Sequence, residues 1–137
     1  MKTNFLLLPL LALFCSCEVE GNLTKDPEVV IIDPVVMPSV IEGQFQSTSG
    51  ITVSGTAKVV QDGTSFKVVL DNFNISSGPD LKVYLSKTNS PSDFVNLGNL
   101  TTSTVYPIPA NVTVSSYKYV LIHCQQFNHL FAVAELK

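Results

Sequence analysis

The side chains that could do redox or ligand chemistry are few in this chain. Cysteine occurs at Cys15, Cys17 and Cys124, and histidine only at His123 and His129. Thiolate sulfur and imidazole nitrogen are ligands for copper and haem iron, and a thiol is itself a redox group. The sequence therefore directs attention to the segment around Cys124.

Cys124 is open to four interpretations: a redox thiol, a metal or haem ligand, one half of an intermolecular disulfide, or a small buried hydrophobic residue. Val120, Ile122 and Cys124 share one apolar face of a predicted strand. A thiol among apolar side chains reacts little. This pattern favours a buried structural thiol and leaves the redox or ligand role open.

The two histidines differ in their relation to Cys124. In a regular strand His123 points to the opposite face from Cys124, so the two cannot hold one metal together. His129 follows at a C-x4-H spacing, as in the copper loops of β-sandwich electron carriers, but an upstream histidine is missing and Val133 stands where an axial methionine is expected. No C-x-x-C-H haem motif is present in the sequence. Copper and haem therefore stay candidate cofactors that experiment must test. For His129 itself, the pattern favours an exposed histidine in a loop.

Asp80 is a further candidate, in the sequence Gly78-Pro79-Asp80-Leu81. Proline presets a backbone angle and aspartate accepts amide hydrogens, so this pattern favours turn chemistry over a functional carboxylate. The sequence has no Ser-His-Asp order in a recognisable context, no phosphate-binding glycine loop and no distinctive pair of carboxylates. It therefore favours a protein that is not an enzyme.

Residues 1–16 are expected to form a lipoprotein signal peptide. Lys2 precedes the apolar run Phe5–Phe14, which is too short to span a bilayer core of about 30 Å. A small residue precedes Cys17, as at the acylated cysteine of bacterial lipoproteins, whereas Cys15 follows a phenylalanine and makes a poor cleavage site. Lipidation of Cys17 would anchor the chain to a membrane. The alternative is an ordinary secreted protein with a cleaved signal.

Residues 17–40 are expected to form the lipidated N-terminus and a proline-rich tether, with Val29–Ile32 as a candidate edge strand. The acidic residues after Cys17 resemble those of surface-exported lipoproteins of Bacteroidetes. We therefore expect a bacterial envelope protein on the periplasmic or surface face of the outer membrane, with a redox or envelope protein as partner. The net charge of −3 and the scattered basic residues argue against nucleic acid.

Residues 41–137 are expected to form one β-domain. Apolar and polar residues alternate without interruption over Ile51–Val59, as in a strand with one buried face, and Asp62-Gly63 favours a tight hairpin turn. The remaining predicted strands are Phe66–Leu70, Leu81–Ser86, Phe94–Leu97, Val105–Ile108, Tyr117–Gln125 and Leu130–Leu136.

Each of these strands is expected to have one solvated face, with Tyr84, Tyr106 and Tyr119 as candidate outward aromatics. Ser90 and Pro91 favour the start of one short helical turn. Many short antiparallel strands separated by turns predict an all-β fold: an antiparallel β-sandwich or flattened barrel of about seven to eight strands.

Several sequence blocks, in their order and spacing, carry a family resemblance. The blocks are Gly43-Gln44-Phe45, Gly55, Leu70-Asp71-Asn72-Phe73, Gly78-Pro79-Asp80-Leu81, Val83-Tyr84-Leu85-Ser86, Leu97-Gly98-Asn99-Leu100, Tyr106-Pro107-Ile108-Pro109 and Val120-Leu121-Ile122-His123-Cys124.

These blocks resemble the DM-thirteen domain, an electron-transfer domain often found beside DOMON domains. The resemblance covers Ile41–Lys137 and implies an extracytoplasmic β-domain in which Cys124 is suspected of redox work or haem ligation. The chain departs from the family at His123, where tryptophan is usual, and at Ala132, where glycine is common. The first departure puts the packing role of the tryptophan in doubt here.

The sequence thus favours a membrane-anchored lipoprotein whose domain is an electron-transfer accessory centred on Cys124, with His129, His123 and Asp80 as secondary candidates. The alternative is a non-catalytic binding or adhesion module for an envelope partner or a glycan, with Cys124 structural. An exposed aromatic patch would favour the alternative.

Overall fold

The computed structural model of the chain describes residues 40–137. The signal peptide predicted for residues 1–16, Cys17, the candidate strand Val29–Ile32 and nearly all of the predicted tether lie outside the described residues. Within residues 40–137, no helix is long and apolar enough to cross a membrane.

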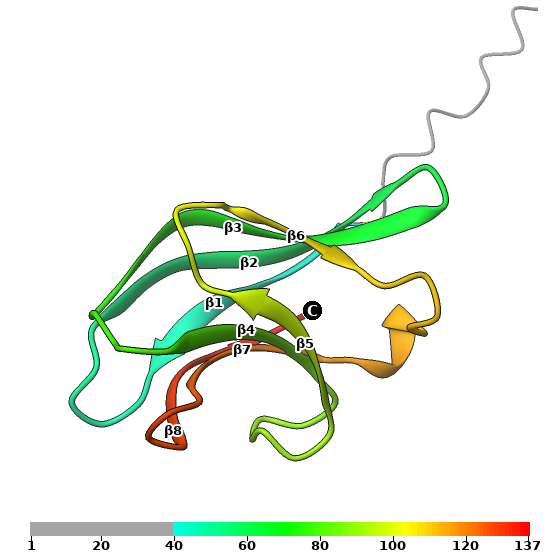
Figure 1. Cartoon of the computed structure of the whole chain (residues 1–137). Helices are drawn as coiled ribbons and strands as arrows, with labels where there is room; N and C mark the ends of the chain where they lie inside the picture. Colours follow the sequence, from blue (N-terminus) through cyan, green and yellow to red (C-terminus); the bar gives the residue numbers. More distant parts are fainter. Residues whose placement is uncertain (1–39) are drawn as a thin grey trace, which may run out of the picture. The chain divides into compact units, whose positions relative to one another are not determined.

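The described chain folds into eight antiparallel strands, which confirms the predicted all-β class and strand number (Figure 1). A single-turn 3-10 helix, η1 (Val114–Ser116), precedes the last two strands. The strands are β1 (Val40–Ser47), β2 (Val53–Asp62), β3 (Ser65–Ile75), β4 (Leu81–Ser86), β5 (Phe94–Asn99), β6 (Val105–Ile108), β7 (Tyr119–Cys124) and β8 (His129–Glu135).

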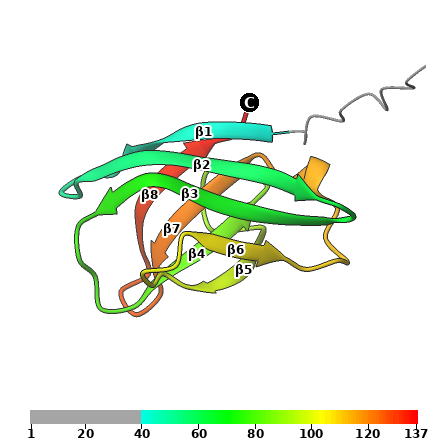
Figure 2. The same ribbon diagram turned by 90° about the horizontal axis from the view of Figure 1, so that it is seen from above.

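The strands form one sheet in the order β5-β4-β7-β8-β1-β2-β3-β6. The sheet curls on itself until its edge strands, β5 and β6, approach each other, so the domain is a nearly closed barrel (Figures 1 and 2). Pro107 lies in β6, and proline donates no ladder hydrogen bond. Its edge position agrees with the expectation for Val105–Ile108.

The predicted β2–β3 hairpin is confirmed. Asp62 pairs with Ser65, and Gly63 has a φ of 61°, which a residue without Cβ adopts at little cost. The alternation predicted over Ile51–Val59 holds, since Ala57 and Val59 are core residues and Ile51 and Val53 pack against the core. Opposite Gly55, however, β3 carries one extra residue, because Ser54 pairs with Asn74 and Thr56 with Asp71. Gly55 has a φ of 104°, and a Cβ there would lie 2.7 Å from backbone atoms of β3. The bulge increases local twist and bends β3, as barrel curvature requires.

The core lies inside the barrel and is built from inward positions of every strand except β5. Its members alternate with outward residues along β2 and β3, as the sequence pattern predicts. The buried core residues are Phe45, Ala57, Val59, Val68, Leu70, Leu81, Val83, Leu85, Tyr106, Ile108, Val120, Ile122, Cys124, Phe131, Ala132, Ala134 and Leu136.

The prediction of one solvated face per strand is wrong for β4 and β7. Their outward residues Tyr84, Ser86, Leu121 and His123 are all buried, although they do not belong to the inner core. The sequence of β7, Tyr-Val-Leu-Ile-His-Cys, indicates burial on both faces, because a strand buried on both faces is apolar at nearly every position.

The predicted helical turn is also misplaced. Residues 91–92 form a turn without a helix, and the 3-10 turn lies at Val114–Ser116. The hydroxyl of Ser86 contacts the carbonyl oxygens of Ser90 and Asp93, at 3.3 Å and 3.2 Å, and thereby shapes the β4–β5 loop. Side chain–backbone bonds of this kind compete with helix formation.

Candidate functional site

Cys124 is the last residue of β7, and its side chain has no solvent exposure. It is a free cysteine in the core of the barrel. In the sheet it is paired with Leu81 of β4 and with His129 of β8. Directly paired residues share a face, so all three side chains leave the sheet on its inner side.

His129 is the first residue of β8 and is exposed at the rim of the barrel. Its ring meets the ring of Phe131 edge-on, with centroids 5.4 Å apart and planes at 73°. The structure therefore brings His129 next to Cys124 across the β7–β8 turn. The imidazole of His129 is exposed to solvent, whereas the thiol of Cys124 is buried.

His123 lies on the outer face of β7, opposite to Cys124. Its ring stacks on that of Tyr84, with centroids 5.4 Å apart and planes at 29°. Tyr84 in turn stacks on Phe94 of β5, with centroids 4.0 Å apart and planes at 11°. His123 thus packs as an aromatic ring, so the doubt about packing at this position does not hold in this structure.

The imidazole of His123 is an unusual buried polar group. It is 5% exposed, and neither Nδ1 nor Nε2 has a hydrogen-bond partner that meets normal geometry. Burial lowers the pKa of His123 below its ordinary 6.5; Asn128 opposes this shift and His129 adds to it. The ring is therefore held neutral on the outer face, at a cost in unmet hydrogen bonds.

Asp80 behaves as a structural residue of the β3–β4 turn. Its carboxylate lies 2.7 Å from the ammonium of Lys82, and its carbonyl accepts a hydrogen bond from the Gln125 amide at 2.9 Å. Burial raises the pKa of the nearby Tyr84. The charge of Lys82 opposes this rise, and the charge of Asp80 adds to it. The backbone of Asp80 therefore ties the start of β4 to the end of β7, while its side chain pairs with Lys82 within β4.

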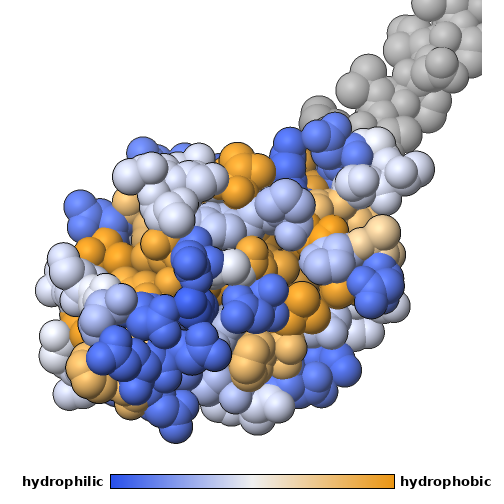
Figure 3. Space-filling view, in the orientation of Figure 1, coloured by the Kyte–Doolittle hydropathy of each residue, from blue (hydrophilic) through white to orange (hydrophobic). Residues whose placement is uncertain are grey.

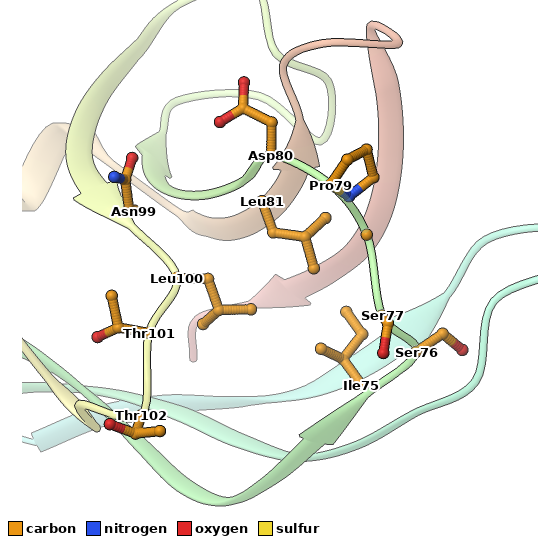
Figure 4. Close-up of a pocket in the computed structure, with 11 residues that line it drawn as sticks. Ile75, Ser76, Ser77, Pro79, Asp80, Leu81, Asn99, Leu100, Thr101 and Thr102 are labelled. Carbon is orange, nitrogen blue, oxygen red and sulfur yellow. The ribbon is translucent and has the colours of Figure 1, made fainter.

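A cleft of about 690 Å³ opens beside Asp80, between the segment before β4 and the segment after β5 (Figure 4). Leu81 and Leu100 point into this space, whereas the Asp80 carboxylate points away from it. Neither Cys124 nor a histidine lines the cleft. Its lining residues are Ile75, Ser76, Ser77, Gly78, Pro79, Asp80, Leu81, Asn99, Leu100, Thr101 and Thr102.

The described residues do not fit a copper or haem site. Residues 40–137 contain no group of three or more His, Cys, Asp or Glu side chains placed to hold a metal ion. Val133 pairs with Leu121 on the outer face, so it is not an axial position for Cys124 and His129. A noncovalent haem needs an apolar slot beside its ligand. The cleft of Figure 4 offers none to Cys124, which does not line it.

The candidate outward aromatics do not form an exposed patch. Tyr84 and Tyr106 are buried, and Tyr119 is half-buried. The Tyr106 hydroxyl donates to the Ser103 carbonyl at 3.0 Å and accepts from the Thr101 amide at 3.2 Å. The expectation that these tyrosines face solvent is wrong for the first two.

The large apolar side chains that are exposed lie apart on the chain. Among the described residues they are Val40, Phe94, Val105 and Phe127, of which Phe127 is 66% exposed. On the face shown in Figure 3, apolar residues alternate with hydrophilic ones and form no single continuous surface. Scattered exposed apolar side chains of this kind are ordinary on the surface of a folded domain.

The fold and the buried thiol together define a small antiparallel barrel with one cysteine at the end of a central strand. The model of the family described as electron transfer DM13 matches residues 44–136. The chain therefore belongs to this family, as its sequence blocks predict. No curated protein and no solved structure matches the chain.

Proposed function

We propose that this protein is an electron-transfer accessory of the cell envelope, in which Cys124 is the redox residue. Membership of the electron transfer DM13 family supports the general role. The observation that carries the residue assignment is the position of Cys124: the one thiol of residues 40–137, fully buried at the strand end beside the rim residue His129.

Burial is compatible with this role. The apolar shell around a redox group controls solvent access and local dielectric, and both tune its potential. Cys124 is shielded from bulk oxidants by the core, yet its direct cross-strand neighbour is the exposed His129. A redox protein docked at this rim would come close to the sulfur while water is kept out.

We further propose that lipidation at Cys17 anchors the protein to a membrane of the envelope, with the domain held in water by the preceding tether. Support comes from the apolar run Phe5–Phe14 and the small residue before Cys17. Cys17→Ser should release the protein from membrane fractions and abolish incorporation of labelled fatty acid. Cys15→Ser is the matched control and should change neither result.

A second function is favoured by one observation, the complete burial of Cys124 among core residues such as Ile122 and Ala132. A cysteine in this setting can act simply as a small apolar side chain. The domain would then be a non-catalytic binding or adhesion module for an envelope partner or a glycan. The cleft beside Asp80, with its hydroxyl and amide rim, would be the first place to look for the ligand.

One protein sample distinguishes the two functions. All eight strands and the core lie within Val40–Lys137, so the chain from Glu18 onward folds without the first two cysteines. Its absorption spectrum, metal content, native thiol titration and redox titration are recorded beside those of Cys124→Ala. A reversible redox transition lost in the variant supports Cys124 as the redox residue. A redox-silent protein whose thiol reacts only after denaturation contradicts it and favours the binding module.

A further inference from the structure

We propose that the end of the β7–β8 hairpin is an acid-sensitive latch that controls access to Cys124, and that His123 is the group through which acid opens it. A role for this latch in electron transfer rests on the proposed function, in which Cys124 is the redox residue. Its test measures access to the thiol and does not depend on a redox activity.

The latch follows from the position of two consecutive residues. His123 and Cys124 are the last two residues of β7, with the imidazole buried on the outer face and the thiol buried on the inner face. They pair with Leu130 and His129 at the start of β8 and with Lys82 and Leu81 of β4. In the proposed latch this end of the hairpin opens as a unit, so that the opening that solvates His123 also uncovers Cys124.

The hairpin end is built to open separately from the rest of the barrel. A register irregularity lies between Ile122 and His123, so the last two pairs are set off from the regular ladder. Residues 125–128 of the turn are exposed, and Asn128 has a left-handed φ of 49°. Segments with exposed backbone bonds and few buried contacts open at lower free energy than the core strands.

The interactions that hold this end closed are mostly backbone and hydroxyl hydrogen bonds. The Gln125 amide donates to the Asp80 carbonyl at 2.9 Å, and the Asn128 amide donates to the Gln125 carbonyl at 3.3 Å. The Thr48 hydroxyl donates to the Leu130 and Phe131 carbonyl oxygens, and the Thr48 amide donates to the Phe131 carbonyl at 3.1 Å. His123 and Cys124 also pair with Lys82 and Leu81 of β4. Among the side chains of this end, the neutral His123 ring stacks on Tyr84, and this is the contact that a proton on His123 would weaken.

A proton on His123 has no anionic partner in the closed state. Lys82 is its cross-strand neighbour on β4 and already engages the carboxylate of Asp80. On β8 the nearby titratable group is His129, which lowers the pKa of His123 further. The Asn128 amide is the one group that favours the charged ring, and burial outweighs it, so the pKa of His123 is lowered. Solvating the ring by opening the hairpin end relieves this conflict.

The test is the protection of Cys124 against a dipyridyl disulfide reagent between about pH 8 and about pH 5. The rate in the folded chain from Glu18 onward is divided by the rate in the unfolded chain at the same pH, which removes the intrinsic pH dependence of the thiol. Protection of Cys124 should fall by up to about tenfold per pH unit once the pH drops below the ordinary histidine pKa. In His123→Phe, which keeps a ring over Tyr84, protection should not change with pH.

A second buried thiol separates local opening from unfolding of the barrel. In a chain carrying Cys124→Ala and Val68→Cys, the new thiol lies on β3 at a position with no exposure. Its protection should exceed that of Cys124 at every pH in this range, because only unfolding of the whole barrel exposes it. The proposal is overturned if Cys124 keeps its protection in acid, if His123→Phe loses protection as the native chain does, or if the β3 thiol is no better protected than Cys124.

Discussion

His123 and Cys124 are neighbours in the chain but are separated by the thickness of the sheet. The imidazole lies over the ring of Tyr84 on the outer face, with centroids 5.4 Å apart, while the thiol lies in the core with no exposure. The alternation of side chains along a strand dictates this separation. Each side chain can therefore be replaced without removing a direct contact to the other.

Replacement of His123 by phenylalanine should stabilise the domain at neutral pH. The substitution keeps an aromatic ring on Tyr84 and removes two buried nitrogens that have no hydrogen-bond partner. Removing such a group relieves a desolvation cost of about 1–3 kcal/mol, part of which the larger ring returns as strain. Urea denaturation should therefore give a higher midpoint with an unchanged slope. A lower midpoint would show that the nitrogens find partners in solution.

The stability of the native domain should fall in mild acid. Because burial lowers the pKa of His123 in the folded state, the unfolded chain binds more protons as the pH drops below 6.5. The contribution of neutral His123 is therefore fully present above pH 6.5 and is lost as the pH falls toward the lowered pKa. Denaturation curves at a series of pH values measure this loss.

The matched control for the pH series is again His123→Phe. The difference in unfolding free energy between the two chains isolates one imidazole from the carboxylates that titrate at lower pH. This difference should grow in favour of the variant as the pH falls. A difference that is constant with pH would contradict the lowered pKa.

Gly43→Ala should be among the most destabilising single substitutions outside the core. A Cβ at Gly43 would lie 2.0 Å from the carbonyl oxygen of Glu135 on the neighbouring strand β8. The contact is with backbone, which cannot move aside as a flexible side chain can, so we expect a loss of about 3 kcal/mol. The control is Gly50→Ala, where φ is 79° but no atom lies within 4 Å, and where about 1 kcal/mol is expected from backbone strain alone. Equal losses in the two variants would show that β1 and β8 separate readily.

Much of this fold could be predicted from the sequence because most of its strands follow simple alternation. Leu81–Ser86 and Val105–Ile108 coincide with β4 and β6, and the Asp62-Gly63 turn lies where the sequence places it. The bulge in β3 opposite Gly55 could not be predicted, because it depends on the curvature that barrel closure imposes on β2 and β3. No strand is predicted over Val40–Ser47, since β1 is held between β2 and β8 and its own sequence is largely polar.

The candidate site was less accessible to sequence reasoning. The pattern of β7 correctly separates His123 from Cys124, but it does not show that both are buried. His123 is buried under Tyr84 of β4, which stacks on Phe94 of β5. The pairing of these strands with β7 is tertiary structure, which the local sequence of β7 does not encode. The nearly unbroken apolar character of β7 is the one local signal of a strand buried on both faces.

The two smallest replacements of Cys124 should differ in stability, and the difference reports what surrounds the sulfur. Cys124→Ser places a hydroxyl among apolar residues such as Leu81 and Ile122, and a buried hydroxyl without a partner costs about 1–3 kcal/mol. Cys124→Ala leaves only a small cavity, so we expect about 1 kcal/mol. Both values come from urea denaturation of the reduced proteins. If serine is tolerated as well as alanine, water reaches the site in the native state, and the thiol is more open to partners than the buried core position implies. If serine is clearly worse, alanine is the proper control for every redox measurement on Cys124, because a lost signal in the serine variant could then reflect a damaged fold.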